Sequence, residues 1–416
     1  MAMMTHHLTE RMWKVLGGLL GILGTILLSL AGQARGQMRQ SIALDRQTEF
    51  ALPSRPVLSV HAWRRSPAPA IRGITIGPIE SSLHPNRGYG TAACARALRE
   101  ARRMGANWVS LTPFGRVFDL KPTGIDLSFE APFVDNKLAV SRAVAQAHAE
   151  GLRVLLVPHL WVETGQWRGE IDPGDETGWE RWSQSYSRFL LTWAHVARDA
   201  GVDMLAVGVE LKSAVTTTHA VRFAETLHEV RSVYPGLLTY AGNWDDIEQT
   251  VILGQLDLIG VNAFYPLSDN PGAGREELMR GARQVSYRVK KLARDWHKPV
   301  LFTEFGYTTR TDPAVRPWEW PEHLEHVLVD EAAQAEAYEA LLAAMISEPW
   351  FAGLFVWRVY ADPEDVSQEA EWGFSPRGKL AELVLRDAFA AYWAADGARP
   401  LGAALHRFAA ERVAVY

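Results

Sequence analysis

Short apolar runs alternate with amphipathic segments along most of the chain, starting near residue 71. The apolar runs carry few charges, as expected for buried parallel strands. They predict strands at residues 71–76, 107–111, 152–157, 204–207, 237–240, 256–261, 300–302 and 354–357. The intervening segments repeat apolar residues at helical spacing. They predict helices at residues 91–104, 136–150, 179–200, 220–234, 246–253, 276–296, 331–346 and 379–390.

This alternation predicts an α/β fold with eight strand–helix repeats in one domain at residues 71–395. Eight repeats favour a closed (β/α)8 TIM barrel over an open doubly wound sheet. No glycine-rich phosphate loop follows a predicted strand, which argues against a nucleotide-binding sheet. The longer inserts, at residues 115–135, 162–178 and 307–330, all follow strands, so we expect them at the C-terminal face, where barrel active sites are built. Residues 396–416 form a predicted C-terminal extension.

The segment at residues 1–36 is typical of a targeting sequence. Arg11 and Lys14 precede an uncharged stretch at residues 15–34, which is about long enough to span a bilayer. Small residues near its end suit a signal peptidase, so a cleaved signal peptide and an uncleaved membrane anchor both fit. Residues 37–70 contain several prolines and arginines and are predicted to form a linker or stalk. We therefore expect an exported protein, either periplasmic or extracellular, or anchored to the membrane by its N-terminal helix.

Composition narrows the class of protein. The chain has 416 residues, of which 48% are hydrophobic and 22% are charged, and this balance suits a globular domain with a sizeable core. The net charge of −5 argues against a nucleic-acid partner, and membrane contact is expected only through the N-terminal segment. The single cysteine, Cys94, excludes an intrachain disulfide and a cysteine-based zinc site. The sequence predicts no cofactor and no particular oligomeric state.

Polar and aromatic side chains follow the predicted strands and are expected to converge on one mouth of the barrel. In chain order they are His159 and Trp161, Glu210, Asn243 and Trp244, Asn262 and Tyr265, Glu304 and Tyr307, and Trp357. The chain also holds 16 Trp and 11 Tyr, and such rings can stack against the flat faces of sugars as well as fill a core.

Glu210 and Glu304 are the candidate catalytic residues. Each directly follows an apolar strand, where an inward-facing carboxylate is costly unless it is used or paired. Their strands, the fourth and the seventh, lie on roughly opposite sides of the barrel, so the two carboxyls can face each other. Carboxyls about 5–5.5 Å apart suit retaining glycoside hydrolysis, with one acid/base and one nucleophile. The alternative is a structural ion pair with a neighbour such as Lys212 or Arg358.

The chain resembles the clan A glycoside hydrolases and, within them, family 113, whose characterised members are β-1,4-mannanases. The resemblance covers about residues 72–386 and rests on several motifs taken together. These motifs are the stretches at residues 107–114, 151–159, 167–169, 238–244, 302–307 and 374–379. The resemblance implies a barrel with Glu210 as acid/base and Glu304 as nucleophile. One departure is Val209, because most clan members carry an asparagine there that binds the sugar 2-hydroxyl; Asn243 or His159 is expected to supply that contact.

Supporting roles follow for the remaining residues at the mouth. Tyr265 is expected to hydrogen-bond Glu304, and Trp357 to form the floor of the sugar subsite next to the scissile bond. The cleft is expected to be lined by Trp161, Trp167, Trp244 and Tyr307, with His159 binding a sugar hydroxyl.

The predicted activity is hydrolysis of a β-linked polysaccharide or oligosaccharide, with β-1,4-mannan as the favoured substrate. The alternatives are a catalytically idle glycan-binding barrel at the cell envelope and a metal-dependent hydrolase. A metal-dependent hydrolase is disfavoured because His159 is the only histidine that ends a predicted strand, and a metal site needs several ligands.

Overall fold

The computed structural model describes residues 70–78, 86–128, 131–319 and 327–391. The predicted leader at residues 1–36, all but the last residue of the linker at 37–70, and the extension at 396–416 lie outside these ranges. Among the described residues, no helix has both the length and the apolar character needed to cross a bilayer.

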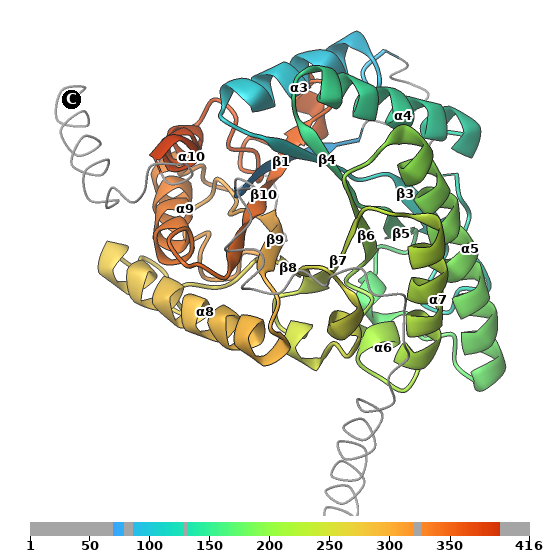
Figure 1. Ribbon diagram of the computed structural model, residues 1–416. Helices are drawn as coiled ribbons and strands as arrows, with labels where there is room; N and C mark the ends of the chain where they lie inside the picture. The colour runs from blue at the N-terminus through green and yellow to red at the C-terminus, as the bar shows by residue number, and fades with distance from the viewer. Residues whose placement is uncertain (1–69, 79–85, 129–130, 320–326, 392–416) are drawn as a thin grey trace, which may run out of the picture. The chain divides into compact units, whose positions relative to one another are not determined.

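The described strands form the closed parallel barrel that the hydrophobic pattern predicts. Within the described residues, eight strands are hydrogen-bonded around the barrel in the order β1, β2, β4, β6, β7, β8, β9 and β10, with β10 pairing with β1 (Figure 1). Their bounds are β1 Ile71–Gly77, β2 Trp108–Leu111, β4 Arg153–Leu156, β6 Met204–Val209, β7 Leu237–Asn243, β8 Ile259–Asn262, β9 Val300–Phe305 and β10 Phe351–Tyr360. The (β/α)8 fold is therefore confirmed.

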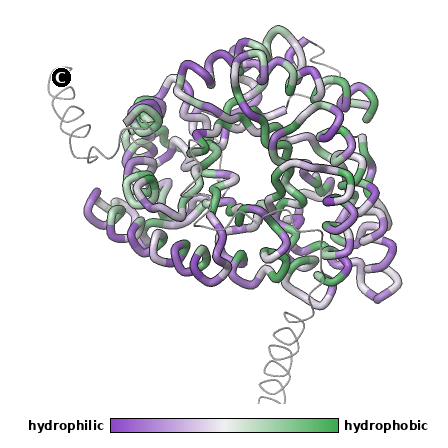
Figure 2. Tube along the Cα trace, viewed as in Figure 1, coloured by the Kyte–Doolittle hydropathy of each residue, from purple (hydrophilic) through white to green (hydrophobic). Residues whose placement is uncertain are grey.

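Helices surround this barrel as an outer ring (Figure 1). They are α3 Ala92–Arg103, α4 Phe133–Ala149, α5 Glu176–Ala200, α6 Lys212–Val215, α7 Ala220–Val233, α8 Arg275–Trp296, α9 Glu331–Met345 and α10 Leu380–Ala391. Hydrophobic residues concentrate on the strands, and many hydrophilic residues lie on the outer helices (Figure 2). The polar sides of the helices therefore face solvent, while their apolar sides pack on the barrel.

One predicted helix differs in the structure. Residues 246–253 form two short 3-10 helices, η2 at Ile247–Gln249 and η3 at Ile252–Gln255. The break falls at Thr250 and Val251, where the amide of Val251 donates to the carbonyl oxygen of Val215 in α6 at 3.1 Å. This tertiary hydrogen bond replaces the one that would continue a helix, and the β-branched side chains at the break add to the preference against it.

The barrel interior is packed with side chains contributed almost entirely by the strands. Its cluster contains Ile71, Trp108, Leu155, Val157, Met204, Ala206, Val209, Ala241, Leu258, Leu301, Ala352 and Phe355. Gly73 in β1 shows how tightly this core is filled, because a Cβ at that position would lie 2.2 Å from the ring of Phe355. The interior is thus a packed core, and open space for a ligand is expected only at its mouth.

A second, two-stranded parallel sheet extends the barrel wall towards the C-terminal face. It pairs β3 at Phe114–Val117 with β5 at His159–Val162. Pro113 and Pro158 separate these strands from β2 and β4, since proline has no amide to continue the hydrogen-bonded ladder. The amide of His159 donates to the carbonyl oxygen of Pro113 at 2.8 Å. This pairing fixes the backbone of His159 at the start of β5.

Candidate active site

Glu210 directly follows β6 in a backbone conformation that favours glycine. Its φ angle is +52°, in the left-handed region that other residues rarely adopt. Hydrogen bonds on both sides hold this turn: the amide of Glu210 donates to Ala241 O at 2.8 Å, and the amide of Leu211 donates to the hydroxyl of Tyr240 at 2.7 Å. Such conformations persist where the surroundings over-determine them, and they cluster at active sites.

Three donors converge on the carboxyl group of Glu210. Trp167 Nε1 and Arg168 Nη1 both donate to Oε2, at 3.0 and 2.8 Å, and Asn262 Nδ2 donates to Oε1 at 3.0 Å. Trp167 and Arg168 come from the loop after β5, where residues Arg168–Glu170 form the 3-10 helix η1. A further bond from Arg168 Nε to Leu160 O, at 2.9 Å, orients the guanidinium. Both oxygens of Glu210 are therefore held in place, and its ion-pair partner is Arg168.

Glu304 lies within β9 and is almost completely buried, with 6% of its surface exposed. Its Oε1 lies 3.3 Å from Nε2 of His159, and Nδ1 of the same ring lies 2.8 Å from Val157 O. Burial raises the pKa of Glu304, the hydrogen bond and charge of His159 lower it, and the charge of Glu210 raises it. The net shift is upwards.

Asn262 connects the surroundings of the two glutamates. It ends β8 and is the direct strand partner of Glu304 in β9, while its side chain donates to Glu210. The hydroxyl of Thr303 donates to Asn262 Oδ1 at 2.9 Å, so the amide is held on both sides. Asn262 and Thr303 are both fully buried. Because paired strands lie only about 4.8 Å apart, Asn262 brings the carboxyl of Glu210 into the neighbourhood of Glu304.

Four of the predicted cleft aromatics lie at or near this mouth with part of their surface exposed. Trp167 donates to Glu210, and Trp161 in β5 is 42% exposed. The ring of Trp357 lies 6.1 Å from the imidazole of His159, with the guanidinium of Arg358 over its face. Trp244 follows β7 and lies 4.9 Å, centroid to centroid, from the half-exposed Trp318.

Two other predicted residues are buried away from the cleft, so the expectations for them were wrong. Tyr307 has no exposed surface; its ring packs near Phe305 and Tyr338, and its hydroxyl donates to Tyr265 O. Tyr265 is 2% exposed and packs against Trp244 and Phe302, and among the described residues the side-chain donor to Glu304 is His159. Tyr307 thus lies among other aromatic rings, whereas Tyr265 also has the guanidinium of Arg288 over its ring at 5.8 Å.

The side-chain nitrogen of Asn243 and both ring nitrogens of His159 have partners within the protein. Asn243 Nδ2 donates to Asp245 Oδ1 at 2.8 Å, and both ring nitrogens of His159 have protein partners. His159 is also 2% exposed. A sugar hydroxyl can therefore reach the ring nitrogens of His159 only if one of these contacts is given up.

Arg168 and Asn262 contact the acid/base candidate directly. Arg168 was not among the predicted site residues, and Asn262 was expected at the mouth but without a role. Asn262 had a usable signal, because it is a polar residue that ends an apolar strand. Arg168 had none beyond its place in a motif with Trp167 and Gly169, since it lies in a loop without periodicity. The ion-pair alternative for Glu210 named Lys212 or Arg358, and the partner that folding supplies is Arg168.

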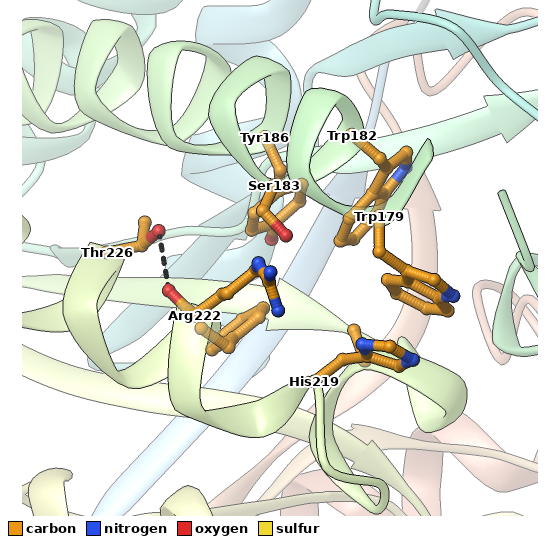
Figure 3. A pocket seen from close by; sticks show the side chains of 9 residues that line it. Trp179, Trp182, Ser183, Tyr186, His219, Arg222 and Thr226 are labelled. Atoms are coloured by element: carbon orange, nitrogen blue, oxygen red, sulfur yellow. Dashed lines mark hydrogen bonds between the residues drawn. The ribbon is translucent and has the colours of Figure 1, made fainter. Parts of the chain in front are cut away.

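The described residues also form a crevice that is separate from the two glutamates. This shallow crevice lies between α5 and α7, lined by Trp179, Trp182, Tyr186, His219 and Arg222 among others (Figure 3). The ring of Trp179 stacks on His219 with 3.9 Å between centroids, and neither glutamate lines this space. Within the described ranges, no group of three or more histidine, cysteine or acidic side chains is arranged to hold a metal ion.

A (β/α)8 barrel with glutamates at the C-terminal ends of its fourth and seventh strands has the architecture of the clan A glycoside hydrolases. The model of one family, Glycoside Hydrolase Family 113, matches residues 82–379, which is more than half of the chain. The chain therefore belongs to Glycoside Hydrolase Family 113 and is a glycoside hydrolase.

Solved structures are similar to this chain in fold, and one of them also has 30% sequence identity. The GH113 β-mannanase AaManA from Alicyclobacillus acidocaldarius, in complex with ManMIm, is 30% identical with a TM-score of 0.67, over 78% of this chain and 99% of that chain. A GH113 β-1,4-mannanase is 22% identical with the same TM-score, over 78% of this chain and all of that chain. A glycoside hydrolase family 5 mannosidase from Rhizomucor miehei shares the fold at 12% identity and a TM-score of 0.53, over 77% and 92%. Comparison with curated proteins gives no significant match.

Proposed function

We propose that this enzyme hydrolyses β-1,4-mannan or its oligosaccharides with retention of configuration, using Glu210 as acid/base and Glu304 as nucleophile. The observation that supports the proposal is that the two carboxyl groups differ in their hydrogen-bond partners. Glu210 is held by Trp167, Arg168 and Asn262, whereas Glu304 is held at Oε1 alone, by His159. Among the described residues none donates to Oε2 of Glu304, which leaves that oxygen free to attack.

The reaction takes place in two displacements. Oε2 of Glu304 bonds to the anomeric carbon, the glycosidic C–O bond breaks, and the leaving oxygen keeps the electron pair and takes a proton from Glu210. Glu210 then removes a proton from water, the water oxygen bonds to the anomeric carbon, and the ester bond to Glu304 breaks. Two inversions give net retention, provided that the carboxyls lie about 5–5.5 Å apart.

The choice of mannan rests on the family and on a relative. The β-mannanase AaManA is 30% identical to this chain and spans 78% of it. The partly exposed Trp161, Trp167, Trp244 and Trp357 offer apolar faces against which sugar rings can stack. The test of substrate is turnover of manno-, gluco-, xylo- and galacto-oligosaccharides by purified enzyme. Preference for a different sugar would overturn the mannan assignment, and binding without turnover would favour an idle glycan-binding barrel.

The test of mechanism separates the two glutamates by their roles. Glu304→Ala is expected to abolish turnover, and added azide to give a glycosyl azide of inverted configuration, because the small anion fills the vacated space. Glu210→Ala is expected to keep the first step on an activated aryl mannoside, whose leaving group needs little acid help. Its second step is then slow for want of a base, and azide rescues that step with retained configuration.

The control for these variants is Glu276→Ala, because Glu276 is an exposed glutamate in the first turn of α8. It is expected to keep full activity. Azide products of the opposite configurations would exchange the roles of Glu210 and Glu304. Full activity of both active-site variants would remove the catalytic assignment altogether.

We also propose that the enzyme acts outside the cytoplasm, either released by cleavage near residue 36 or held at the membrane by the uncleaved segment. The support is the uncharged stretch at residues 15–34 with Arg11 and Lys14 before it. Fractionation of expressing cells and N-terminal sequencing of the mature protein test this proposal. Recovery of the intact chain from the cytoplasm alone would contradict it.

A further inference from the structure

The imidazole of His159 is fixed between a backbone carbonyl and a catalytic carboxyl. Its Nδ1 lies 2.8 Å from Val157 O, and a carbonyl oxygen can only accept a hydrogen bond, so Nδ1 must carry a proton. The other nitrogen, Nε2, lies 3.3 Å from Glu304 Oε1. These two atoms form a hydrogen bond only if one proton lies between them.

That proton allows two states of the pair. Either Glu304 is a neutral acid that donates to a neutral imidazole, or Glu304 is a carboxylate that accepts from an imidazolium. Exposure is 2% for His159 and 6% for Glu304, so water has little access to replace the missing donor. A nucleophile must be ionised, and therefore only the imidazolium–carboxylate state can react.

We propose that His159 is a positioning residue that carries a second ring proton in the active enzyme, and that this proton keeps the buried Glu304 ionised with Oε2 free to attack. This inference rests on the proposed role of Glu304 as nucleophile. It replaces the expectation that His159 binds a sugar hydroxyl. Burial by itself raises the pKa of Glu304, so a buried nucleophile in this place requires a neighbouring positive charge.

The other groups around the pair are consistent with this role. Glu210 and Arg168 are the further charges that act on Glu304, the first raising and the second lowering its pKa. They also form an ion pair with each other at 2.8 Å, so their effects largely oppose. Two aromatic rings also lie beside the imidazole, those of Phe114 at 5.2 Å and Trp357 at 6.1 Å between centroids, and the guanidinium of Arg358 lies over the ring of Trp357. His159 thus supplies the hydrogen bond and the positive charge closest to the carboxyl of Glu304.

The test is His159→Gln, because a glutamine amide can donate to Glu304 but cannot carry the additional proton. We expect the acid limb of the kcat/KM profile to move up by about one pH unit or more, because Glu304 loses a neighbouring cation. An activated aryl mannoside separates this effect from Glu210, since it needs little acid help. The shift of the acid limb should therefore remain on that substrate.

A second measurement does not depend on activity. In ¹⁵N NMR spectra, the protonated-ring signals of His159 should persist to higher pH in the unsubstituted protein than in Glu304→Gln, because the two groups stabilise each other's charge. The matched control is His148→Gln, which removes a surface histidine whose Nε2 lies 3.1 Å from Asp203 Oδ2. It should leave the pH profile unchanged.

Two results would overturn the inference. One is a His159→Gln variant that is folded and has the profile of the unsubstituted enzyme. The other is a His159 ring that has only one proton at the pH of maximal activity. If either occurs while Glu304→Ala is inactive, the proposed mechanism stands and only the role of His159 fails. If Glu304→Ala is active, the proposed mechanism itself fails.

Discussion

At the residue scale, the proposed mechanism requires different protonation states of the two glutamates: Glu210 must be protonated to act as an acid, and Glu304 must be ionised to act as a nucleophile. Both oxygens of Glu210 accept hydrogen bonds, and Arg168 adds a positive charge. To act as an acid, Glu210 must take up a proton, and Oε1 is the oxygen with only one donor.

A neighbouring acid gives a residue-scale prediction about stability and pH. Asp246 is 1% exposed, and its Oδ2 is buried with no hydrogen-bond partner. Burial and the charge of Asp245 raise its pKa to about 7, against the opposing charge of Lys212. In the unfolded chain an aspartate releases its proton near pH 4. The folded protein therefore retains a proton that the unfolded chain has lost, and stability should fall as the pH rises from about 4 to about 7.

Asp246→Asn removes the buried carboxyl group, and with it the loss of stability at high pH. The variant should match the unsubstituted protein near pH 4 and be more stable by roughly 1–3 kcal/mol at pH 8. Urea unfolding at the two pH values measures the difference. Asp269→Asn serves as control, because Asp269 is exposed, and it should change stability little at either pH. An Asp246→Asn variant that is less stable at pH 8 would show that the buried carboxylate has a partner that stabilises its charge.

At the element scale, the turn that ends β6 determines where Glu210 points. The strand is a continuous buried run, and the chain leaves it at Glu210 with a positive φ angle. The hydroxyl of Tyr240 in β7 accepts from the amide of Leu211, the residue that follows. The neighbouring strand thus supports the turn through a side chain, so the orientation of Glu210 depends on the pairing of β6 with β7.

Tyr240→Phe tests this support. Loss of the hydroxyl leaves the Leu211 amide buried without an acceptor, at a cost of about 1–3 kcal/mol in folding stability. Displacement of Glu210 should also lower kcat about tenfold to a hundredfold on substrates with poor leaving groups. Activated aryl mannosides, which need little acid help, should lose much less.

The matched control is Tyr234→Phe, measured by the same assays and by urea unfolding. Tyr234 is equally buried, and its hydroxyl donates to Val202 O at 2.7 Å, beyond the other end of β6. We expect a loss of stability of about 1 kcal/mol with unchanged kinetics. Unchanged kinetics in Tyr240→Phe as well would mean that the turn holds Glu210 without help from β7.

At the scale of the whole molecule, loops from different strands jointly build the surface around the mouth. Trp244 follows β7, Trp318 lies in the loop after β9, and their rings lie 4.9 Å apart at an angle of 31°. Trp318 is 49% exposed, so it presents an aromatic surface to solvent. Apolar ring faces of this kind suit a further sugar of a long chain.

We expect Trp318→Ala to lower kcat/KM on polymeric mannan about threefold to tenfold, through an increase in KM. Hydrolysis of a short aryl mannoside should be unaffected, because it does not reach beyond the glutamates. Tyr287→Ala is the control, since Tyr287 is 74% exposed on the outer helix α8. An equal loss on short and long substrates would mean that Trp318 supports the fold of the loop rather than the polymer.

The sequence by itself determined the barrel and its two glutamates. Buried parallel strands must be short and apolar, and eight of them in alternation with helices leave few other folds. Glu210 and Glu304 were visible because carboxylates directly after such strands are costly without a purpose. These inferences use only local pattern and chain order, which is why they needed no contact between distant residues.

The tertiary structure decided which side chains meet. Arg168 contacts Glu210 across 42 residues of chain, and His159 contacts Glu304 across 145. Tyr265 and Tyr307 also follow strands, yet packing against neighbouring side chains buries both rings. Sequence pattern places a residue at the end of a strand, but the direction of its side chain depends on the groups that folding brings beside it. Those contacts determined the partners of both glutamates.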